Sequence, residues 1–421
     1  MMRILWITNI IFPEAAESLT GKGEIRSTGG WLVSMLDSLK TVPGIVLFTA
    51  TVSSKVSELV EVKKSGVTHY IFPAARRNYT YEKKYESFWR KVIESVNPDI
   101  IHIHGTECPH GLSCLNIFPQ KTYVVSVQGL VTEIAKHFYD GLSKRTILSN
   151  ITIRDILKTN LLQEQRRFYK RGLYEEAILK RVYYVIGRTS WDYAIVKSIN
   201  PDLHYFTGNE SLRNAFYTGR WEYNRCKPHT VFLSQVGVSY KGFHMFLKAM
   251  TIVLNCFPDM KVVIAGDNVL RDDGSWLRKK TISGYGKICN KIIEENHLRS
   301  KIEFTGKLND EEMKAQLLGS NVFVSCSSIE NSPNSLAEAQ ILGVPCVASY
   351  VGGVPDMIPN NDCGWMYRYE DYQKLAFLLI DIFNTSKYFD NSIMIKTAKE
   401  RHNRDANVKS LLEVYNTIAK H

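Results

Sequence analysis

Short apolar runs alternate with amphipathic stretches along the whole chain. In the first half, these runs have the length of strands: Ile4–Ile10, Ile45–Ala50, His69–Phe72, Ile100–His104, Tyr123–Val127, Tyr183–Gly187 and Leu203–Phe206. Several are apolar at successive positions, which is typical of parallel strands covered by helices on both faces. Segments with helical periodicity lie between them: Gly30–Lys40, Glu82–Val96, about Arg145–Arg181 and Ser190–Ile199. The pattern predicts β-α-β units in a parallel sheet.

The second half repeats this alternation. Its predicted strands are Thr230–Ser234, Lys261–Ala265, Lys301–Phe304, Val322–Ser325 and Cys346–Ser349, and its predicted helices are Phe243–Asn255, Gly286–Asn296, Asp310–Leu318 and Ser335–Leu342. Two such series predict an α/β protein of two Rossmann-like, doubly wound domains that face a central cleft. The break falls in the polar stretch Tyr223–His229, which gives domains 1–225 and 226–403. For the last helix, 404–421, packing back on the N-terminal domain is one hypothesis.

Composition places the chain among ordinary globular proteins. Of its 421 residues, 44% are hydrophobic and 23% are charged, which argues against disorder. No apolar run reaches the roughly 18 residues of a membrane span. The first run, Ile4–Phe12, is interrupted by Thr8 and Asn9, so we interpret it as a buried strand and not as a secretion signal. None of the eight cysteines forms a Cys-x-x-Cys pair, which favours reduced thiols in a cytoplasmic protein.

The positive charge is concentrated in the first half. Residues 1–225 contain 30 basic and 21 acidic side chains, whereas the remainder contains 23 and 21. The densest stretch, Lys144–Arg188, interleaves eleven basic residues with apolar ones. It predicts a basic amphipathic helix, or a pair of helices, able to bind an anionic membrane peripherally, at the inner face. A solvated surface helix is the alternative. Nucleic acid is not an expected partner, because clustered aromatic residues on a basic strand face are absent.

The strongest constellation follows the predicted strand Val322–Ser325. Glu330 lies in a loop, and Glu338 is expected in the first turn of the next helix. Free amides of Asn334–Ala337 at that helix N-terminus suit an anion such as a diphosphate. A carboxylate next to a phosphate site suits a neutral polyol such as a ribose. The alternative for Glu338 is structural, because Ser335-x-x-Glu338 also fits a capping box.

This stretch resembles the Glu-x7-Glu motif of the retaining GT-B glycosyltransferases of family 4, the group 1 glycosyl transferases. Further segments match that family in order: Lys241-Gly242 before a helix, "VVIAGD" ending at Asp267, "IEFTGKL" at 302–308 and "LGVPCVASYVGGVPDMI" after the motif. In the first half, Gly29-Gly30 and "PDIIHIHG" at 98–105 also match. The resemblance covers most of the chain and is densest from 230 to 360.

The resemblance implies a role for each matching residue of the second half. Glu338 is expected to bind the ribose hydroxyls of a nucleotide-sugar donor, and Glu330 to contact the donor sugar. Lys241 is expected to neutralise the leaving diphosphate, an electrostatic effect that such a site can make large. Three backbone amides are expected to hold the diphosphate: those of Asn334, Ser335 and Leu336.

Other matching residues are expected to act through the main chain. Gly29 and Gly30 lack a Cβ, which would let the backbone approach the donor phosphates, although an ordinary turn explains them too. Main-chain contacts to the base are expected from three residues, for which an ordinary loop is the alternative: Gly306, Lys307 and Leu308.

The chain departs from the family pattern at two positions. Val236 stands where the family commonly has an arginine, so Arg188 is a candidate substitute, with structural pairing as the alternative. Gln128 stands where many members have a histidine, and it can bind a sugar hydroxyl but cannot act as a base. On the strand before it, His104 is a candidate for the active site, and His102 is expected to point to the opposite face and be buried.

The sequence thus predicts a retaining glycosyltransferase that moves a sugar from a nucleoside diphosphate sugar to a hydroxyl of a cell-surface glycan or its lipid-linked precursor. Glu330 and Lys241 are its expected catalytic residues, with attack on the face that the leaving group departs from. Neither a metal nor a cofactor is expected. A non-catalytic nucleotide-sugar binding protein and a GT-B epimerase or hydrolase are the alternatives.

Overall fold

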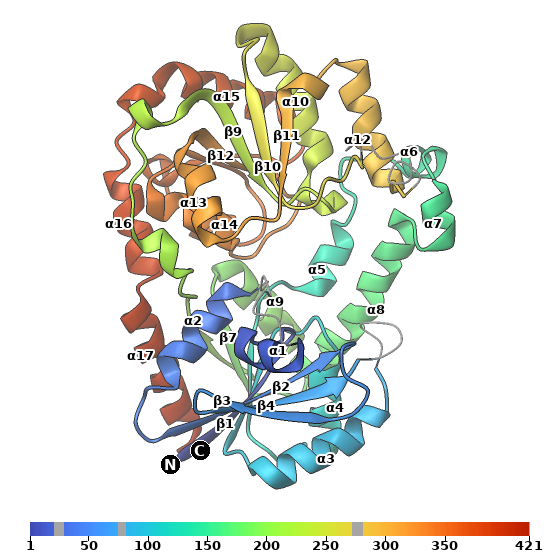
Figure 1. Cartoon of the computed structure of the whole chain (residues 1–421), viewed down its shortest axis with the longest axis vertical. Coiled ribbons are helices and arrows are strands. Elements are labelled where there is room, and N and C mark those ends of the chain that lie inside the picture. Colours follow the sequence, from blue (N-terminus) through green and yellow to red (C-terminus); the bar gives the residue numbers. More distant parts are fainter. Residues whose placement is uncertain (21–28, 75–80, 272–280, 421) are drawn as a thin grey trace. The chain divides into compact units, whose positions relative to one another are not determined.

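The structure is a computed structural model that describes residues 1–20, 29–74, 81–271 and 281–420 (Figure 1). The chain forms two compact units. Unit 1 contains Met1–Thr132, Phe168–Arg213 and His402–His421, and unit 2 contains Glu133–Arg167 and Asn214–Arg401. Each unit is built on one sheet of its own, which confirms the predicted α/β class with two largely parallel sheets.

The sheet of unit 1 has the strand order β3-β4-β2-β1-β5-β6-β7-β8. Its strands are β1 (Met2–Ile7), β2 (Ile45–Ser53), β3 (Val60–Lys64), β4 (Val67–Pro73), β5 (Ile100–His104), β6 (Tyr123–Ser126), β7 (Tyr184–Gly187) and β8 (His204–Thr207). All neighbours are parallel except β3 and β4. The chain winds outward from β1 and then returns to the other side of it, so the topological switch point lies between β1 and β5.

Alternate side chains of β1 enter two different cores. Leu5 and Ile7 pack in a cluster with helices α3 (Lys84–Val96) and α4 (His110–Ile117). Ile4 and Trp6 pack in a second cluster with α2 (Gly30–Leu39) and α17 (Arg404–Ile418), which contact each other. A strand buried on both faces must be apolar at every position, which explains the continuous apolar run of the sequence.

The remaining helices of unit 1 border these two layers. They are α1 (Pro13–Thr20), α9 (Ser190–Ile199), the first residues of α5 (Val131–Lys136) and most of α8 (Leu161–Leu179). The C-terminal helix α17 is part of this unit, and the indole Nε1 of Trp6 donates a hydrogen bond of 2.9 Å to the hydroxyl of Tyr415. The first and the last element of the chain therefore share one core.

The sheet of unit 2 is wholly parallel, in the order β11-β10-β9-β12-β13-β14. Its strands are β9 (Lys227–Ser234), β10 (Lys261–Ala265), β11 (Ile302–Gly306), β12 (Ser320–Ser325), β13 (Cys346–Ser349) and β14 (Trp365–Tyr367). Three helices share one core with this sheet: α10 (Phe243–Cys256), α12 (Gly284–Glu295) and α15 (Tyr372–Thr385). A further helix, α14 (Asn334–Leu342), contacts both α13 (Asp310–Leu318) and α16 (Ser392–Arg401).

Residues 133–167 belong to unit 2, although the expected domain boundary placed them in the first domain. The backbone amide of Gly284 donates to Asp155 Oδ2 at 2.8 Å, and Thr152 Oγ1 donates to the carbonyl of Ile282 at 2.9 Å. These side-chain bonds join the segment to the start of α12. Sequence periodicity cannot show hydrogen bonds between segments so far apart in the chain.

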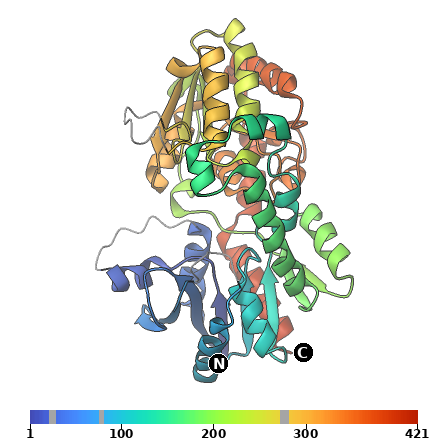
Figure 2. The same cartoon turned by 90° about the vertical axis from the view of Figure 1, so that its right-hand side faces the viewer.

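The basic stretch predicted as one long helix or a pair forms three helices instead. They are α6 (Lys144–Ser149), α7 (Ile153–Leu157) and α8, and Figure 2 shows them as separate helices coloured from blue-green to green. Side-chain caps explain the breaks: Ser143 caps α6, and Thr152 forms a capping box with Asp155 at the start of α7. The basic stretch is thereby divided between the two units.

Candidate functional site

The site predicted from the sequence lies at the switch point of the unit 2 sheet. From β9 the chain winds outward to β10 and β11, and it then returns to β12 on the other side of β9. In open parallel sheets, ligands bind beyond the carboxyl ends of the strands at this point. The loops that follow β9 and β12 carry Lys241 and Glu330, so the topology brings these two residues together.

Lys241 and Glu330 form an ion pair. The ammonium nitrogen Nζ lies 2.5 Å from Oε1 of Glu330, and the hydroxyl of Ser327 donates to the same oxygen at 2.7 Å. The two charged side chains are 20% and 14% exposed. Burial opposes the charged form of Lys241, but the pairing with Glu330 prevails and raises the pKa of the lysine above its ordinary value. The structure therefore holds a protonated amine beside a carboxylate.

Two glycines allow this close approach. Gly242 has a φ of +71°, and a Cβ on it would lie 1.8 Å from the carbonyl oxygen of Cys326. Gly352 has a φ of +49°, and a Cβ there would lie 2.0 Å from the carbonyl oxygen of Glu330. The amide of the next residue, Gly353, donates to that oxygen at 3.0 Å. Larger residues at either position would displace the loops that position the ion pair.

Helix α14 begins beside this loop without a side-chain cap. Its N-cap is Pro333, whose carbonyl accepts from the amide of Leu336 at 3.0 Å. Among the described residues, the amide of Ser335 has no acceptor. The capping box Ser335-x-x-Glu338 is therefore absent, because Ser335 lies inside the helix. Of the three amides expected to hold a diphosphate, that of Leu336 is engaged by the carbonyl of Pro333.

Glu338 lies one residue further along its helix than expected, because α14 begins at Asn334 and not at Ser335. It is the fifth residue of the helix, so it is outside the first turn, and it is 4% exposed. A carboxylate that is so deeply buried in a helix is held by its polar neighbours or by a ligand.

The three residues expected near the base follow β11, at the same carboxyl edge of the sheet. Gly306 has a φ of +75°, and its carbonyl accepts from the amide of Gly266 at 2.8 Å. This bond joins the ends of β10 and β11. Lys307 is exposed and Leu308 is half-buried in the loop that follows. Lys241 follows β9, two strands from β11 in the sheet, and lies at the same carboxyl edge.

A segment that sequence reasoning did not include also contacts these loops. The hydroxyl of Ser328 donates to the carbonyl of His137 at 2.7 Å, and Ser239 donates to the carbonyl of Phe138. His244 Nε2 lies 2.9 Å from the carbonyl oxygen of Asp140. Because the acceptors are backbone carbonyls, the sequence held no signal for these contacts.

The remaining predicted residues belong to unit 1. Gly29 is in the left-handed region, with a φ of +95°, and Gly30 begins α2. A Cβ on Gly30 would lie 2.8 Å from the Cγ and Cδ of Arg213, so packing against this side chain accounts for the glycine. Gln128 follows β6, and its backbone carbonyl accepts from Arg188 Nη2 at 2.7 Å.

Arg188 is held within unit 1 by acidic groups. Its Nη1 lies 2.7 Å from Glu210 Oε1, and its backbone amide donates to Asp192 Oδ2 at 2.9 Å. Of the two interpretations of Arg188, the structure shows the pairing.

The expectation that His102 and His104 point to opposite faces is wrong. Their rings stack at 3.8 Å between centroids, because residues two positions apart on a strand share a face. Both are buried, and within the described chain neither ring nitrogen of His104 has a hydrogen-bond partner. Burial lowers the pKa of both rings, that of His102 to about 3. His104 is thus a neutral side chain packed near Trp6, at a ring distance of 4.4 Å.

Glu107 is a chemically notable residue that sequence reasoning missed. It follows β5 at the switch point of unit 1, where Asn9 Nδ2 donates to its Oε2 at 2.7 Å. Burial raises its pKa to about 7. A Cβ on Gly105 would lie 2.1 Å from this oxygen, so the glycine makes room for the carboxyl group. Its position two residues after a glycine at a strand end was the available signal.

Two features are absent from the described residues. No group of three or more histidine, cysteine, aspartate or glutamate side chains is placed to hold a metal ion. No helix within the described ranges is long and apolar enough to cross a membrane.

Comparison with known proteins identifies the region that contains the ion pair. Residues 221–401 match the family model described as "Glycosyl transferases group 1". The chain is 30% identical to an amylovoran biosynthesis glycosyltransferase of Erwinia amylovora over 173 residues, which are 37% of this chain and 42% of that protein. Against three curated bacterial relatives, the chain aligns over about half of their length, 42 to 52%.

Solved structures resemble the chain over its full length. A sucrose-phosphate synthase of Thermosynechococcus elongatus has a TM-score of 0.68 and 14% identity, with 99% of each chain covered. The Anabaena protein HepE, solved in complex with UDP-glucose, has a TM-score of 0.65 and 13% identity, with 99% of this chain and 100% of HepE covered. At identities this low, the structural likeness establishes the fold alone. The chain therefore has the GT-B fold, and its residues 221–401 are similar to the group 1 glycosyl transferases.

Proposed function

We propose that the chain is a retaining glycosyltransferase that transfers a sugar from a nucleoside diphosphate sugar to a glycan hydroxyl. The observation that carries this proposal is the Lys241–Glu330 ion pair at the switch point of the unit 2 sheet. The uncapped start of α14 follows Glu330 by four residues in the same loop. A cation and a helix N-terminus together suit a diphosphate, and the carboxylate suits a sugar hydroxyl.

Each residue has a distinct part in this proposal. Lys241 exchanges its contact with Glu330 for one with the diphosphate, and it stabilises the negative charge that develops as the glycosidic bond breaks. The amides of Asn334 and Ser335 bind phosphate oxygens. Glu330 then accepts a hydrogen bond from the donor sugar, and Glu338 binds the ribose hydroxyls.

Retention is proposed to follow from attack on the face that the leaving group departs from. The leaving phosphate accepts the proton of the acceptor hydroxyl, so the reaction needs no enzymic base. Lys241 and the helix N-terminus supply the positive charge for the diphosphate, and we propose that no metal ion is required. A transfer rate that is unchanged by EDTA is the expected result.

The donor and the product class are proposed from the comparisons. Two of the solved neighbours carry UDP-glucose or UDP-2-fluoro-glucose, so uridine diphosphate sugars are the first donors to test. The relative from Erwinia amylovora is named for amylovoran biosynthesis. A polysaccharide, or its lipid-linked precursor, is accordingly the proposed acceptor.

Peripheral membrane binding is proposed for the surface formed by α6 and α7. Four large apolar side chains lie exposed within ten residues: Leu148 at 55%, Ile153 at 71%, Ile156 at 76% and Leu157 at 79%. Exposed basic side chains flank them at Lys144, Arg145 and Lys158. Apolar residues beside cations are the composition that inserts into an anionic lipid surface. An acceptor on a lipid carrier would be presented there.

The proposed function is tested by product analysis with a panel of labelled nucleotide sugars. The full chain is incubated with each donor, with and without glycan acceptors, and the anomeric configuration of the product is read by NMR. Acceptor-dependent transfer with retention supports the proposal. Donor binding without turnover would identify a binding protein, and acceptor-independent conversion would identify an epimerase or hydrolase. Either outcome contradicts the proposal.

A further inference from the structure

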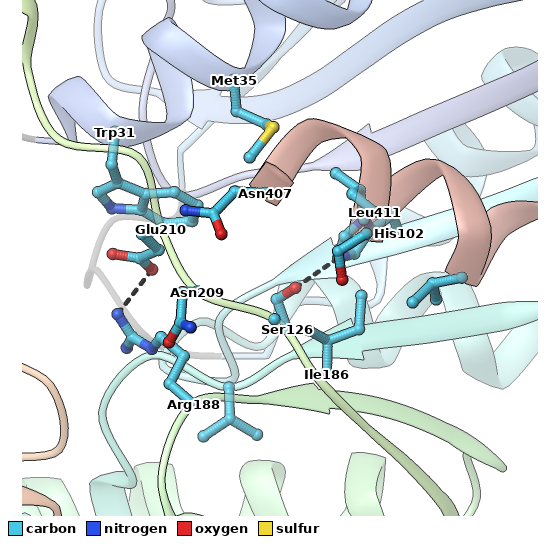
Figure 3. A pocket seen from close by; sticks show the side chains of 14 residues that line it. Trp31, Met35, His102, Ser126, Ile186, Arg188, Asn209, Glu210, Asn407 and Leu411 are labelled. Atoms are coloured by element: carbon cyan, nitrogen blue, oxygen red, sulfur yellow. Dashed lines mark hydrogen bonds and ion pairs between the residues drawn. The ribbon is translucent and has the colours of Figure 1, made fainter. Parts of the chain in front are cut away.

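Unit 1 contains a pocket that the proposed transfer chemistry does not use. It is a partly open hollow of about 490 Å³, a volume that includes space continuous with solvent. Its walls come from α2, from the carboxyl ends of β6, β7 and β8, and from α17 (Figure 3). The carboxyl edge of a parallel sheet is where such folds bind ligands.

The pocket carries no net charge. Arg188 and Glu210 both line it, and their ion pair of 2.7 Å is almost fully buried, so their charges cancel. His102, the histidine among the lining residues, is neutral because burial holds its pKa near 3. A phosphate or a carboxylate would therefore find no unneutralised cation in this pocket. A neutral ligand fits the electrostatics.

A chain of hydrogen bonds orients one hydroxyl toward the pocket. Trp6 Nε1 donates to the hydroxyl of Tyr415 at 2.9 Å, which lies 2.6 Å from His102 Nδ1. An indole N–H can only donate. The proton of Tyr415 must therefore go to Nδ1, since a buried hydroxyl proton left without an acceptor is costly. His102 then carries its own proton on Nε2.

This tautomer fixes the direction of the next bond. His102 Nε2 lies 2.7 Å from Ser126 Oγ, so the histidine donates and the serine accepts. The proton of Ser126 has no protein acceptor within the described chain. Because Ser126 lines the pocket, its hydroxyl can donate a hydrogen bond to a ligand there. The chain of bonds reaches the pocket from Trp6 on β1.

Other lining groups complement this donor. The Oδ1 atom of Asn209 is buried and has no hydrogen-bond partner among the described residues, so it lacks a donor. Figure 3 shows the amides of Asn209 and Asn407, the hydroxyl of Ser126 and the indole of Trp31 around one space. The site thus offers a donor, an acceptor and an aromatic face. A pyranose has hydroxyls that both donate and accept, and a C–H face that packs on an aromatic ring.

We propose that this pocket binds a neutral pyranose, which accepts a hydrogen bond from Ser126, donates one to Asn209 and packs against Trp31. The proposal rests on the proposed function only in its choice of source for the sugar. That source is either the end of the glycan acceptor or a free sugar. Nothing in the unit 2 site is needed for the pocket to form, because every lining residue belongs to unit 1.

The test measures how methyl pyranosides of glucose, galactose, mannose and N-acetylglucosamine bind to the full chain. Saturation-transfer NMR and calorimetry report this binding. Asn209→Ala removes an acceptor that no protein group uses, so the fold is expected to survive it. It should weaken binding of the preferred glycoside about tenfold, as should Ser126→Ala. The matched control is Asn384→Ala, an exposed asparagine of α15, which should bind as the parent does.

Two further arms separate the sources and the proposals. If the sugar is the acceptor end, Asn209→Ala also raises the KM for a glycan acceptor; if it is a free sugar, that KM is unchanged. A Lys241→Ala variant should lose UDP binding in a thermal-shift assay and retain glycoside binding, so failure of the transferase proposal would leave this one intact. The pocket proposal is overturned if no neutral glycoside binds, or if both pocket variants bind as tightly as the parent.

Discussion

Lys241 and Glu330 are 89 positions apart in the chain, and their side chains are 2.5 Å apart in the structure. No local motif joins them. They meet because β9 and β12 are neighbours in the sheet, although two further β-α units separate them in sequence. In this structure each residue neutralises the other, so a donor that binds here must offer an anion to Lys241 and a hydrogen-bond donor to Glu330.

Removal of the lysine charge is expected to impair transfer strongly. Lys241→Ala should lower kcat about 10²- to 10³-fold, because the leaving diphosphate loses a preorganised cation. Steady-state kinetics with the preferred donor measure this. Lys374→Ala removes an exposed lysine of α15 from the same unit and should leave kcat unchanged. Equal rates for both variants would exclude Lys241 from catalysis.

The backbone of the Lys241 loop is expected to tolerate no side chain at Gly242. Gly242→Ala should reduce the stability of unit 2 by about 1–3 kcal/mol, since the residue has a positive φ and its Cβ would overlap the carbonyl of Cys326. Urea unfolding monitored by circular dichroism gives the difference. Gly237→Ala is the control, because nothing lies within 4 Å of a Cβ there. If the two variants unfold alike, the loop is not constrained as described.

Acid is expected to weaken unit 2 through His244. Burial lowers the pKa of this histidine to about 4, whereas in the unfolded chain it is near 6.5. Between these values only the unfolded state binds the proton, so the free energy of unfolding falls as the pH drops from about 6.5 to about 4. His244→Gln can still donate to the carbonyl of Asp140 but does not titrate. Its stability should depend less steeply on pH in this range, and an unchanged slope would contradict the buried neutral state.

Membrane binding is expected to need both kinds of residue on α6 and α7. The triple charge reversal of Lys144, Arg145 and Lys158 should lower partition onto anionic vesicles at least about a hundredfold, since each basic residue contributes about 1 kcal/mol at such a surface and the new acidic residues are repelled by it. Sedimentation with phosphatidylglycerol vesicles measures it, and neutral vesicles give the baseline.

A second variant separates apolar insertion from charge attraction. Replacement of Ile153, Ile156 and Leu157 by serine should also release the protein from anionic vesicles. Phe377→Ser is the control, because Phe377 is 64% exposed on α15 and lies outside the α6–α7 surface. Parent-like sedimentation of both the charge and the apolar variants would refute the docking surface.

Strands and loops that follow from the local periodicity of apolar and polar residues could be predicted from the sequence. The apolar runs gave most strands of both sheets, and the Glu-x7-Glu spacing located the loop that carries Glu330. Strand β3 escaped prediction because Val60–Lys64 alternates with charged residues and pairs only at a sheet edge. An edge strand buries little apolar surface and so leaves a weak pattern.

Features that depend on pairing between distant residues could not be predicted. The sequence does not show that Arg188 pairs with Glu210. Ser335-x-x-Glu338 fits a capping box in sequence, but the helix begins at Asn334. A shift of one residue in a helix start removes a cap, and sequence patterns do not resolve helix ends that finely. The stacked His102 and His104 are different, because strand geometry alone should have placed them on one face.

The bond between Trp6 and Tyr415 has a consequence for how the protein is made. The two residues are separated by 409 positions, and a ribosome adds about 5–20 residues per second, so roughly 20 to 80 seconds pass between their synthesis. For all of that time, the face of β1 that carries Ile4 and Trp6 has no α17 to cover it. Synthesis of unit 1 therefore begins early, but the unit is completed only when α17 has been made. Until then the nascent chain needs protection from aggregation.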